Sequence, residues 1–411
     1  MHLKVTITHE GTDVHCGDLY TQMLRGRESA MFRYSDIWLS SGYALSPDLP
    51  LTTGSFSSHD GLADLRVFQD CMPDRWGRNL LDRDENRRAR EAGDTPRKLG
   101  EVDYLVGVSD ATRQGAIRVW DETGQPLSVS ANSVPREVDL PKLLDASDLA
   151  SKDLTADVQD LVNAGSSLGG ARPKATIRDA SGNLYICKLP KTDEVGERDV
   201  CAWEYVAMQL SEDVGINVMP SKLLRIGKRS VLITKRFDRD GTVRIPYISG
   251  MSAVSGNDGG RYSLLELVDF IEQECARPEE NLRELWLRAL FTCAVGNTDN
   301  HMRNYGFLRQ GDGWTLAPQF DVNPSMGNSS KMLASAVDAN DYSADVELVV
   351  EVSEFYRVTR EEAIRQCGMV AKALSGWQKI ARRASIDESS IAAFKPCFEA
   401  GIAKLLACAS S

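Results

Sequence analysis

An apolar stretch in the second half of this 411-residue chain ends abruptly in a polar loop. Leu282 to Val295 carries large apolar residues at helical spacing on more than one side, which predicts a buried helix. The residues that follow it, 296–304, read GNTDNHMRN. A polar loop therefore follows directly on a helix that is expected to be buried.

The loop carries an acid and an amide at a spacing that serves phosphoryl transfer. Asp299 and Asn304 are separated by four residues, as in the catalytic loop of kinases. There the aspartate accepts the proton of the attacking hydroxyl and the asparagine binds Mg²⁺. Two predicted strands, 305–308 and 314–317, then lead to Asp321, where kinases place a metal-binding aspartate. Either motif alone is an ordinary turn; together they predict an enzyme that uses ATP and Mg²⁺.

A small-residue loop and a hairpin–helix–hairpin pattern precede this region. The loop at 165–170 (GSSLGG) suits close approach of backbone N–H groups to phosphate oxygens. Lys188 lies on the returning strand of the first hairpin, and Glu204 lies in the helix, where it can hold that lysine in position. We predict the first hairpin at 174–189, the helix at 199–214 and the second hairpin at 222–237.

Composition and charge limit the class of protein. The net charge of −11 does not favour direct binding of nucleic acid, which usually requires a basic face. Nine cysteines without a CxxC pair predict reduced, mostly buried thiols. The sequence contains no stretch long and apolar enough for a membrane helix, and residues 1–11 lack the apolar core of a signal peptide. A cytoplasmic protein is therefore expected.

The chain is predicted to fold as an α+β protein with a kinase-like arrangement of two lobes. The small lobe is rich in strands, the large lobe is mainly helical, and an α/β subdomain precedes both. Strands are expected at 3–8 and 31–39, a helical stretch broken by Pro73 at 61–90, and closing helices at 362–374 and 391–406. The predicted segments are 1–123 for the N-terminal subdomain, 124–150 for the linker and lead-in, 151–243 for the small lobe, and 244–411 for the large lobe.

Seven sequence motifs resemble those of HipA-family toxin kinases. They are FRYSDIWL (32–39), FQDCMPDRWGRNLL (68–81), SSLGGARPKA (166–175), YICKLP (185–190), KRFDR (235–239), NTDNHMRNYGFL (297–308) and APQFDV (317–322). The resemblance spans most of the chain. It implies a serine/threonine kinase of a toxin–antitoxin module, inhibited by a helix-turn-helix antitoxin of HipB type that binds operator DNA. Substrates of this family include aminoacyl-tRNA synthetases, whose phosphorylation arrests translation.

The resemblance also implies a role for individual residues. Asp299 is the catalytic base, Asn304 and Asp321 are the Mg²⁺ ligands, and Lys188 contacts the phosphates of ATP. Phe237 and Lys235 are expected at the adenine, and Asp238 and His301 near the ribose. The expected nucleotide-binding set is Ser167, Leu168, Gly169, Gly170, Lys188, Lys235, Phe237, Asp238 and His301.

Ser167 matches the loop serine that is autophosphorylated in this family, and Ser166 beside it is a second candidate. A phosphate there would place close to two negative charges where the nucleotide phosphates bind, so we expect it to switch the enzyme off. The chain departs from the family at Lys235, where an acidic residue is common, and at Phe320, where tyrosine is common. Both departures concern the nucleotide pocket more than the chemistry.

Three functions of different classes agree with these residues. The first is an active protein kinase. The second is a small-molecule kinase on the same scaffold, because phosphoryl transfer uses the same parts whatever carries the hydroxyl. The third is a catalytically weak corepressor that binds the antitoxin. The complete set of Lys188, Asp299, Asn304 and Asp321 argues against the third, since a binding module has no physical need of all four.

Overall fold

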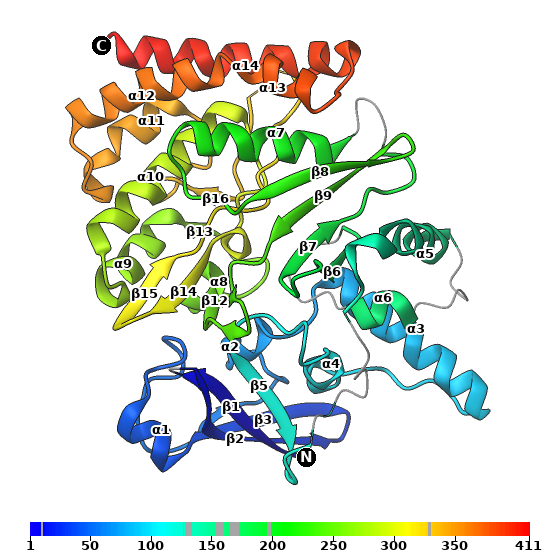
Figure 1. Ribbon diagram of the computed structural model, residues 1–411. Helices are drawn as coiled ribbons and strands as arrows, with labels where there is room; N and C mark the ends of the chain where they lie inside the picture. The colour runs from blue at the N-terminus through cyan, green and yellow to red at the C-terminus, as the bar shows by residue number, and fades with distance from the viewer. Residues whose placement is uncertain are drawn as a thin grey trace. The chain divides into compact units, whose positions relative to one another are not determined.

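The protein is described by a computed structural model that covers residues 1–9, 11–125, 127, 134–152, 159–164, 172–194, 199–327 and 330–411. It forms two compact units. Unit 1 comprises Met1–Lys191 and Lys235–Ile248, and unit 2 comprises Thr192–Thr234 and Ser249–Ser411. Both units contain helices and strands, as the predicted α+β class requires (Figure 1). The two units do not coincide with the four predicted segments, whose boundaries stay a prediction.

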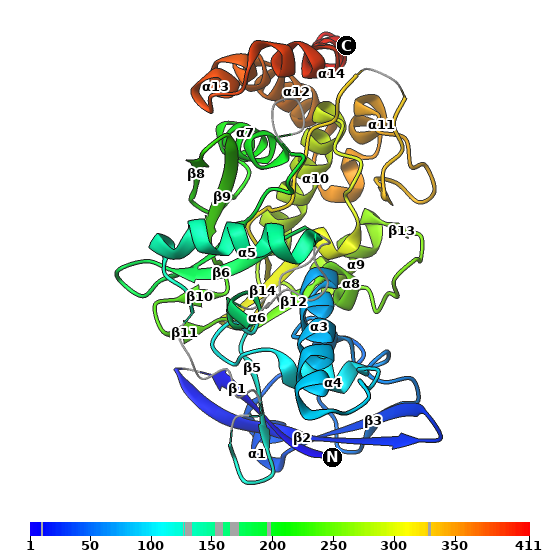
Figure 2. The same ribbon diagram turned by 90° about the vertical axis from the view of Figure 1, so that its right-hand side faces the viewer.

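The N-terminal part of unit 1 is a five-stranded antiparallel sheet in the order β4-β3-β2-β1-β5, of which β1, β2, β3 and β5 are labelled in Figure 2. Leu3, Val5 and Ile7 of β1 are buried, whereas the residues between them are half-buried, so one face of the sheet packs on a core. The strands are β1 (His2–His9), β2 (Thr12–Leu24), β3 (Arg27–Tyr34), β4 (Phe56–Ser58) and β5 (Ile117–Asp121).

The sequence predictions for this part were correct for β1 and incomplete elsewhere. The strand expected at 31–39 ends at Tyr34, because Ser35 caps the short helix α1 (Asp36–Ser41) through its hydroxyl. The helical stretch is broken near Pro73 as predicted, into α2 (Arg66–Gln69) and α3 (Arg75–Ala92). Strand β2 was missed, since its alternation is interrupted by polar residues on both faces.

A buried ion cluster attaches residues 235–248 to unit 1. Both Asp238 carboxylate oxygens bind Arg236, at 2.8 and 2.7 Å, and one of them also binds Arg239 at 2.8 Å. Gly115 N–H donates to the same carboxylate at 2.7 Å, and Arg236 donates to the Thr112 carbonyl at 2.7 Å. The cluster therefore fixes the start of β10 (Arg239–Asp240) and β11 (Val243–Arg244) against the loop that precedes β5.

The remainder of unit 1 contains a hairpin and two more helices. Strands β6 (Lys174–Arg178) and β7 (Leu184–Lys188) pair antiparallel, as the sequence predicted. Helix α6 packs against α3, α5 and β6 through the buried side chains Leu161 and Ala164. The helices are α4 (Glu101–Gly107), the short 3₁₀ turn η1 (Glu137–Asp139), α5 (Leu140–Lys152) and α6 (Gln159–Ala164).

Helix α10 (Pro278–Val295) is the centre of unit 2. Every residue from Arg288 to Val295 is buried, so the last two turns are covered on all sides. Helix α14 (Glu388–Ala409) crosses it so closely that a side chain on Gly401 would overlap the Ala294 carbonyl. Helices α11 (Val346–Glu351) and α9 (Leu264–Glu274) also contact α10, and α12 (Arg360–Leu374) packs on α14 (Figure 1).

Helix α7 (Val200–Asp213), which carries Glu204, also belongs to unit 2. Its Trp203 ring stacks on Phe394 of α14 with centroids 3.8 Å apart, and its indole N–H donates to Ser390 at 3.0 Å. Asp199 caps the helix, and Val214 ends it one residue before the predicted Gly215. The hairpin of β8 (Ser221–Ile226) and β9 (Arg229–Lys235) follows, as predicted.

Shorter elements complete the chain. They are β12 (Tyr247–Ser249), α8 (Gly250–Ala253), β13 (Tyr262–Ser263), η3 (Met302–Asn304), β14 (Gly306–Gln310), β15 (Gly313–Leu316), β16 (Ser335–Ala336), η4 (Ser353–Tyr356) and α13 (Trp377–Arg383). All nine cysteines are free and eight are buried, which confirms the predicted thiols. Among the described residues, no helix combines the length and apolar character needed to span a bilayer.

The ion cluster predicts a pH-dependent contribution of Asp238 to stability. Burial alone would raise the pKa of Asp238, but Arg236 and Arg239 outweigh it and hold that pKa far below its usual range. Asp238→Asn should lower the free energy of unfolding by about 3–5 kcal/mol at pH 7, because two buried guanidinium groups lose their counter-charge. A depressed folded-state pKa stabilises above the unfolded pKa, so the difference between the two proteins should shrink below about pH 4.

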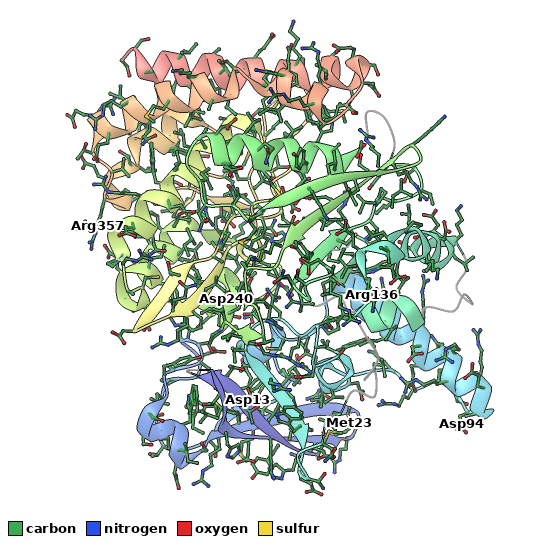
Figure 3. All side chains as sticks on the ribbon, viewed as in Figure 1. Asp13, Met23, Asp94, Arg136, Asp240 and Arg357 are labelled. Carbon is green, nitrogen blue, oxygen red and sulfur yellow. The ribbon has the colours of Figure 1, made fainter. Side chains whose placement is uncertain are left out.

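Chemical denaturation between pH 3 and 7 measures this difference. Asp240→Asn is the matched control, because Asp240 lies two residues away and is exposed (Figure 3). An Asp238→Asn variant as stable as wild type at pH 7 would contradict the structural role of the cluster.

Candidate active site

The loop that follows α10 is fixed at its base by backbone hydrogen bonds. Gly296 caps α10 with a positive φ of 65°, a conformation that glycine adopts without strain. Asn297 N–H donates to the Thr292 carbonyl at 2.9 Å. Ser325 also bonds the end of α10. Its N–H donates to the Val295 carbonyl at 3.3 Å, and its hydroxyl donates to the Gly296 carbonyl. The segment after Asp321 therefore returns to the start of the loop.

The structure brings Asp299 and Asn304 together within this loop. Asn304 Nδ2 donates to the Asp299 carbonyl at 2.6 Å, and Asn304 N–H donates to the His301 carbonyl at 2.8 Å. The Asp299 side chain is 70% exposed, so it is accessible to a substrate hydroxyl. Within the described part of the chain, no donor bonds Asn304 Oδ1. That amide oxygen is the atom a hard cation such as Mg²⁺ prefers.

His301 lies beside the catalytic candidate. Its Nε2 is 3.7 Å from Asp299 Oδ1, close enough for electrostatic attraction but too far for a good hydrogen bond. Its Nδ1 is buried and has no hydrogen-bond partner among the described residues. A buried ring nitrogen without a partner is costly, so a bound ligand or water is the expected partner at this atom.

Asp321 is held in a strained backbone conformation. Its φ is 56°, in the left-handed region that non-glycine residues rarely occupy. Strands β14 and β15 deliver it, and Gln319 N–H just before it donates to the Asn217 carbonyl at 2.7 Å. Such strain costs on the order of 1–3 kcal/mol and concentrates at functional positions, where the surrounding structure imposes it. The backbone strain at Asp321 therefore agrees with a ligand-binding role for this residue.

Unit 1 contributes two lysines on one face of the β6–β7 hairpin. Lys174 and Lys188 are direct cross-strand partners, so their side chains share a face and would repel one another. Asp74, the N-cap of α3, neutralises Lys174 with an ion pair of 3.0 Å in which both side chains are almost fully buried. The positive charge of Lys174, the cross-strand neighbour of Lys188, is therefore neutralised within unit 1 by Asp74.

The structure corrects the expectation for Asp238. A ribose contact requires an accessible carboxylate oxygen, but Asp238 is 1% exposed and both its oxygens accept from Arg236, Arg239 or Gly115. Its role is structural. Phe237, in contrast, is half-buried beside Tyr247 with ring centroids 5.6 Å apart, and Lys235 is half-buried at the end of β9.

The remaining predicted residues stay predictions. Ser166, Ser167, Leu168, Gly169 and Gly170 lie outside the described residues, as do residues 126 and 128–133 of the predicted linker and lead-in. Glu204 is 3% exposed within α7 of unit 2, so its carboxylate needs a charged or hydrogen-bonding partner.

Sequence reasoning missed three polar residues that the structure places around the loop or the hairpin. They are Lys174, Asn300 and Asn323. Asn323 Oδ1, two residues after Asp321, is buried without a donor among the described residues. No local pattern marks Lys174 or Asn300, because their partners come from distant parts of the chain.

Comparison with known proteins identifies the family. Residues 166–385, more than half of the chain, match the model of the HipA-like C-terminal domain, and residues 12–99 match that of the HipA N-terminal domain. The chain belongs to the HipA family. This confirms the resemblance inferred from the motifs, and with it a kinase of the serine/threonine kinase toxin family.

Individual relatives are distant in sequence. The chain is 26% identical over 325 residues to a putative kinase, Y4mE, of Sinorhizobium fredii, covering 71% of each protein. It is 21% identical over 372 residues to the serine/threonine-protein kinase toxin HipA of Shewanella oneidensis, covering 79% of this chain and 78% of that protein. The structure of the Shewanella HipA in complex with HipB and operator DNA superposes with a TM-score of 0.68 at 15% identity, covering 99% and 96% of the two chains. This likeness shows the kinase-like α+β fold.

The strain at Asp321 can be measured by comparing two substitutions that both remove the carboxylate. Asp321→Gly should be more stable than Asp321→Ala by about 1 kcal/mol, because glycine tolerates positive φ and alanine does not. Asn323 is the control, because its φ is not positive. There the alanine variant, Asn323→Ala, should be at least as stable as the glycine variant, Asn323→Gly. Thermal denaturation of the four variants tests this, and equal stability of the two Asp321 variants would contradict the left-handed conformation.

Proposed function

We propose that this chain is an ATP- and Mg²⁺-dependent serine/threonine protein kinase and the toxin of a toxin–antitoxin module. The observation that carries the proposal is the Asp299–Asn304 pair on a loop anchored to α10, with the strained Asp321 on the segment that returns to the loop base. Family membership supports the same reaction class.

Asp299 is the proposed catalytic base. Its exposed carboxylate orients a substrate hydroxyl and accepts its proton as the oxygen attacks the γ-phosphorus of ATP and the bond to the β-phosphate breaks. His301 Nε2 lies beside this carboxylate, 3.7 Å from Asp299 Oδ1. The orphan Nδ1 of His301 agrees with a hydrogen bond to the bound nucleotide.

Asn304 and Asp321 are the proposed Mg²⁺ ligands. One amide oxygen and one carboxylate fit Mg²⁺, which keeps several waters and takes phosphate oxygens as further ligands. The hydrogen bond from Asn304 Nδ2 to the Asp299 carbonyl supports this assignment, because it leaves Oδ1 as the atom directed to a ligand. When bound, Mg²⁺ neutralises charge on the phosphate oxygens during transfer.

Lys188, Phe237, Lys235 and residues 167–170 are proposed to bind ATP. Lys188 would neutralise phosphate oxygens, and the buried Glu204 would hold it in place. Phe237 and Lys235 would contact the adenine. Ser167, or Ser166, is the proposed autophosphorylation site, and a Ser167→Asp variant that keeps full activity would disprove its inhibitory effect.

The proposed partners come from the family. The relative's complex contains HipB and its operator DNA, so an antitoxin of HipB type is the proposed partner, with nucleic acid bound only through it. An aminoacyl-tRNA synthetase is the proposed substrate class, and phosphorylation would arrest translation and growth. The cytoplasm is the proposed location, since that is where such substrates occur.

Transfer of label from γ-labelled ATP tests the proposal. Purified wild type, with Mg²⁺ and a cell lysate, should label itself or a discrete protein. Asp299→Asn should lower this transfer by about 10²–10⁴-fold, because it removes the base without changing the size of the side chain. Asp312→Asn is the matched control, an exposed aspartate in the β14–β15 turn that should leave transfer unchanged.

Other outcomes identify other functions. Consumption of ATP with metabolites but no labelled protein would indicate a small-molecule kinase. Binding of ATP without consumption by the wild type would overturn the kinase proposal and indicate a binding module.

A further inference from the structure

The Asn300 side chain makes a dense set of hydrogen bonds directly after the catalytic candidate. Its Oδ1 accepts from Ala334 N–H at 2.8 Å and from Ser335 N–H at 3.1 Å. Its Nδ2 donates to the Ser335 carbonyl at 3.0 Å. The side chain also bonds Tyr305, whose pKa burial raises to about 12 while the Asn300 contact opposes that rise. Asn300 is 2% exposed, and its hydrogen-bonding capacity is fully used.

These bonds join the loop to a distant segment. Asn300 pairs with the N–H and the carbonyl of Ser335 as a neighbouring strand would, and Ala334 N–H donates in addition to the Thr298 carbonyl at 3.1 Å. Ser335 and Ala336 form β16, which pairs in parallel with β13 ahead of the capped helix α9. The middle of the loop is thus bound to a rigid part of unit 2.

Among the described residues, the contacts of Asp299 itself lie within its own loop. In the part of the chain that the structure describes, Asp299 N–H donates one long bond of 3.4 Å to Asn297 Oδ1, and the Asp299 side chain is exposed. Asn304 is oriented by the Asp299 carbonyl, so it follows any shift of Asp299. The peptide that joins Asp299 to Asn300 therefore determines the position of both functional side chains.

We propose that Asn300 is a positioning residue that sets Asp299 and Asn304 through the Asn300–Ser335 contact. The inference rests on the proposed kinase function. Because Asn304 is the proposed Mg²⁺ ligand, loss of the contact should weaken use of the metal as well as slow the transfer of phosphate. If Asn300 served stability alone, its substitution would change neither the Mg²⁺ requirement nor the rate of phosphate transfer of the molecules that remain folded.

Asn300→Ala is the first variant to measure. We expect kcat to fall by about 10²-fold, the effect of a displacement of about 1 Å at the reacting groups. The Mg²⁺ concentration for half-maximal rate should rise by about tenfold, as for other residues that orient a metal ligand. The KM for ATP should change by less than about threefold, because Asn300 is not among the residues proposed to hold the adenine and phosphates.

Asn281 provides a matched control in the same unit. Its buried amide also bonds backbone, accepting from Leu316 N–H at 2.6 Å and donating to the Arg277 carbonyl at 2.6 Å. It lies near the start of α10, roughly 20 Å from the loop by the rise of 1.5 Å per residue. Asn281→Ala should lower thermal stability to a similar degree and leave the Mg²⁺ requirement unchanged.

Hydrogen exchange tests the contact without relying on activity. The amide of Ser335 should exchange faster in Asn300→Ala and remain as in wild type in Asn281→Ala, where the Leu316 amide should exchange faster instead. The Ala334 amide keeps its bond to the Thr298 carbonyl and is not used as a reporter. Unchanged exchange at Ser335 would show that the contact does not exist.

Kinetics then decide the positioning role. If the wild type is active and Asn300→Ala has the same kcat and the same Mg²⁺ requirement, the positioning role is overturned. The kinase function is then left intact. A wild type that transfers no phosphate would instead overturn the kinase function, and the positioning role with it.

Discussion

The complete burial of the last two turns of α10 is the constraint on which the site depends. Residues 288–295 are buried on every side of the helix. The chain must therefore turn sharply after Val295 to reach the solvent. Gly296 makes that exit with a positive φ, and a side chain there would meet Lys331 Nζ at 2.6 Å and Cys397 Sγ at 3.0 Å. The polar loop thus begins at one defined point of a packed core. This is how Asp299, the proposed catalytic base, can be exposed and still keep a fixed position.

Three separate contacts then hold the rest of the site relative to that point. Ser325 ties the segment after Asp321 to the end of α10, Asn300 ties the loop to β16, and Asn304 bonds back to Asp299. The strain at Asp321 is imposed on this framework and would relax in a looser one. Precise placement matters because phosphoryl transfer depends mainly on positioning and electrostatic stabilisation.

Local sequence patterns predicted the elements whose signals are local. The apolar periodicity of α10, the turn residues of the β6–β7 hairpin and the spacing of Asp299 and Asn304 each lie within a short window, and each element was found where expected. What was missed depends on residues far apart in the chain. The pairing of Lys174 with Asp74 joins positions 100 residues apart by number, and Asn300 meets a segment more than 30 residues downstream.

The Asp238 expectation failed for the same reason. A motif shows that an aspartate is present but not what surrounds it. Its partner Gly115 comes from the loop before β5, and the two arginines beside it complete a buried cluster. Chemistry inferred from a motif therefore needs the three-dimensional neighbours of each side chain before a role is assigned.

We propose that Asn304 and Asp321 together bind the Mg²⁺ ion next to Asp299, the proposed catalytic base. A crystal structure of the chain with Mn²⁺ in place of Mg²⁺ and a non-hydrolysable ATP analogue tests it most directly, because anomalous scattering locates the metal. We expect an anomalous peak bonded to Asn304 Oδ1 and the Asp321 carboxylate, with the terminal phosphate facing Asp299. A metal bound elsewhere, or a nucleotide bound with neither residue at the metal, would contradict it.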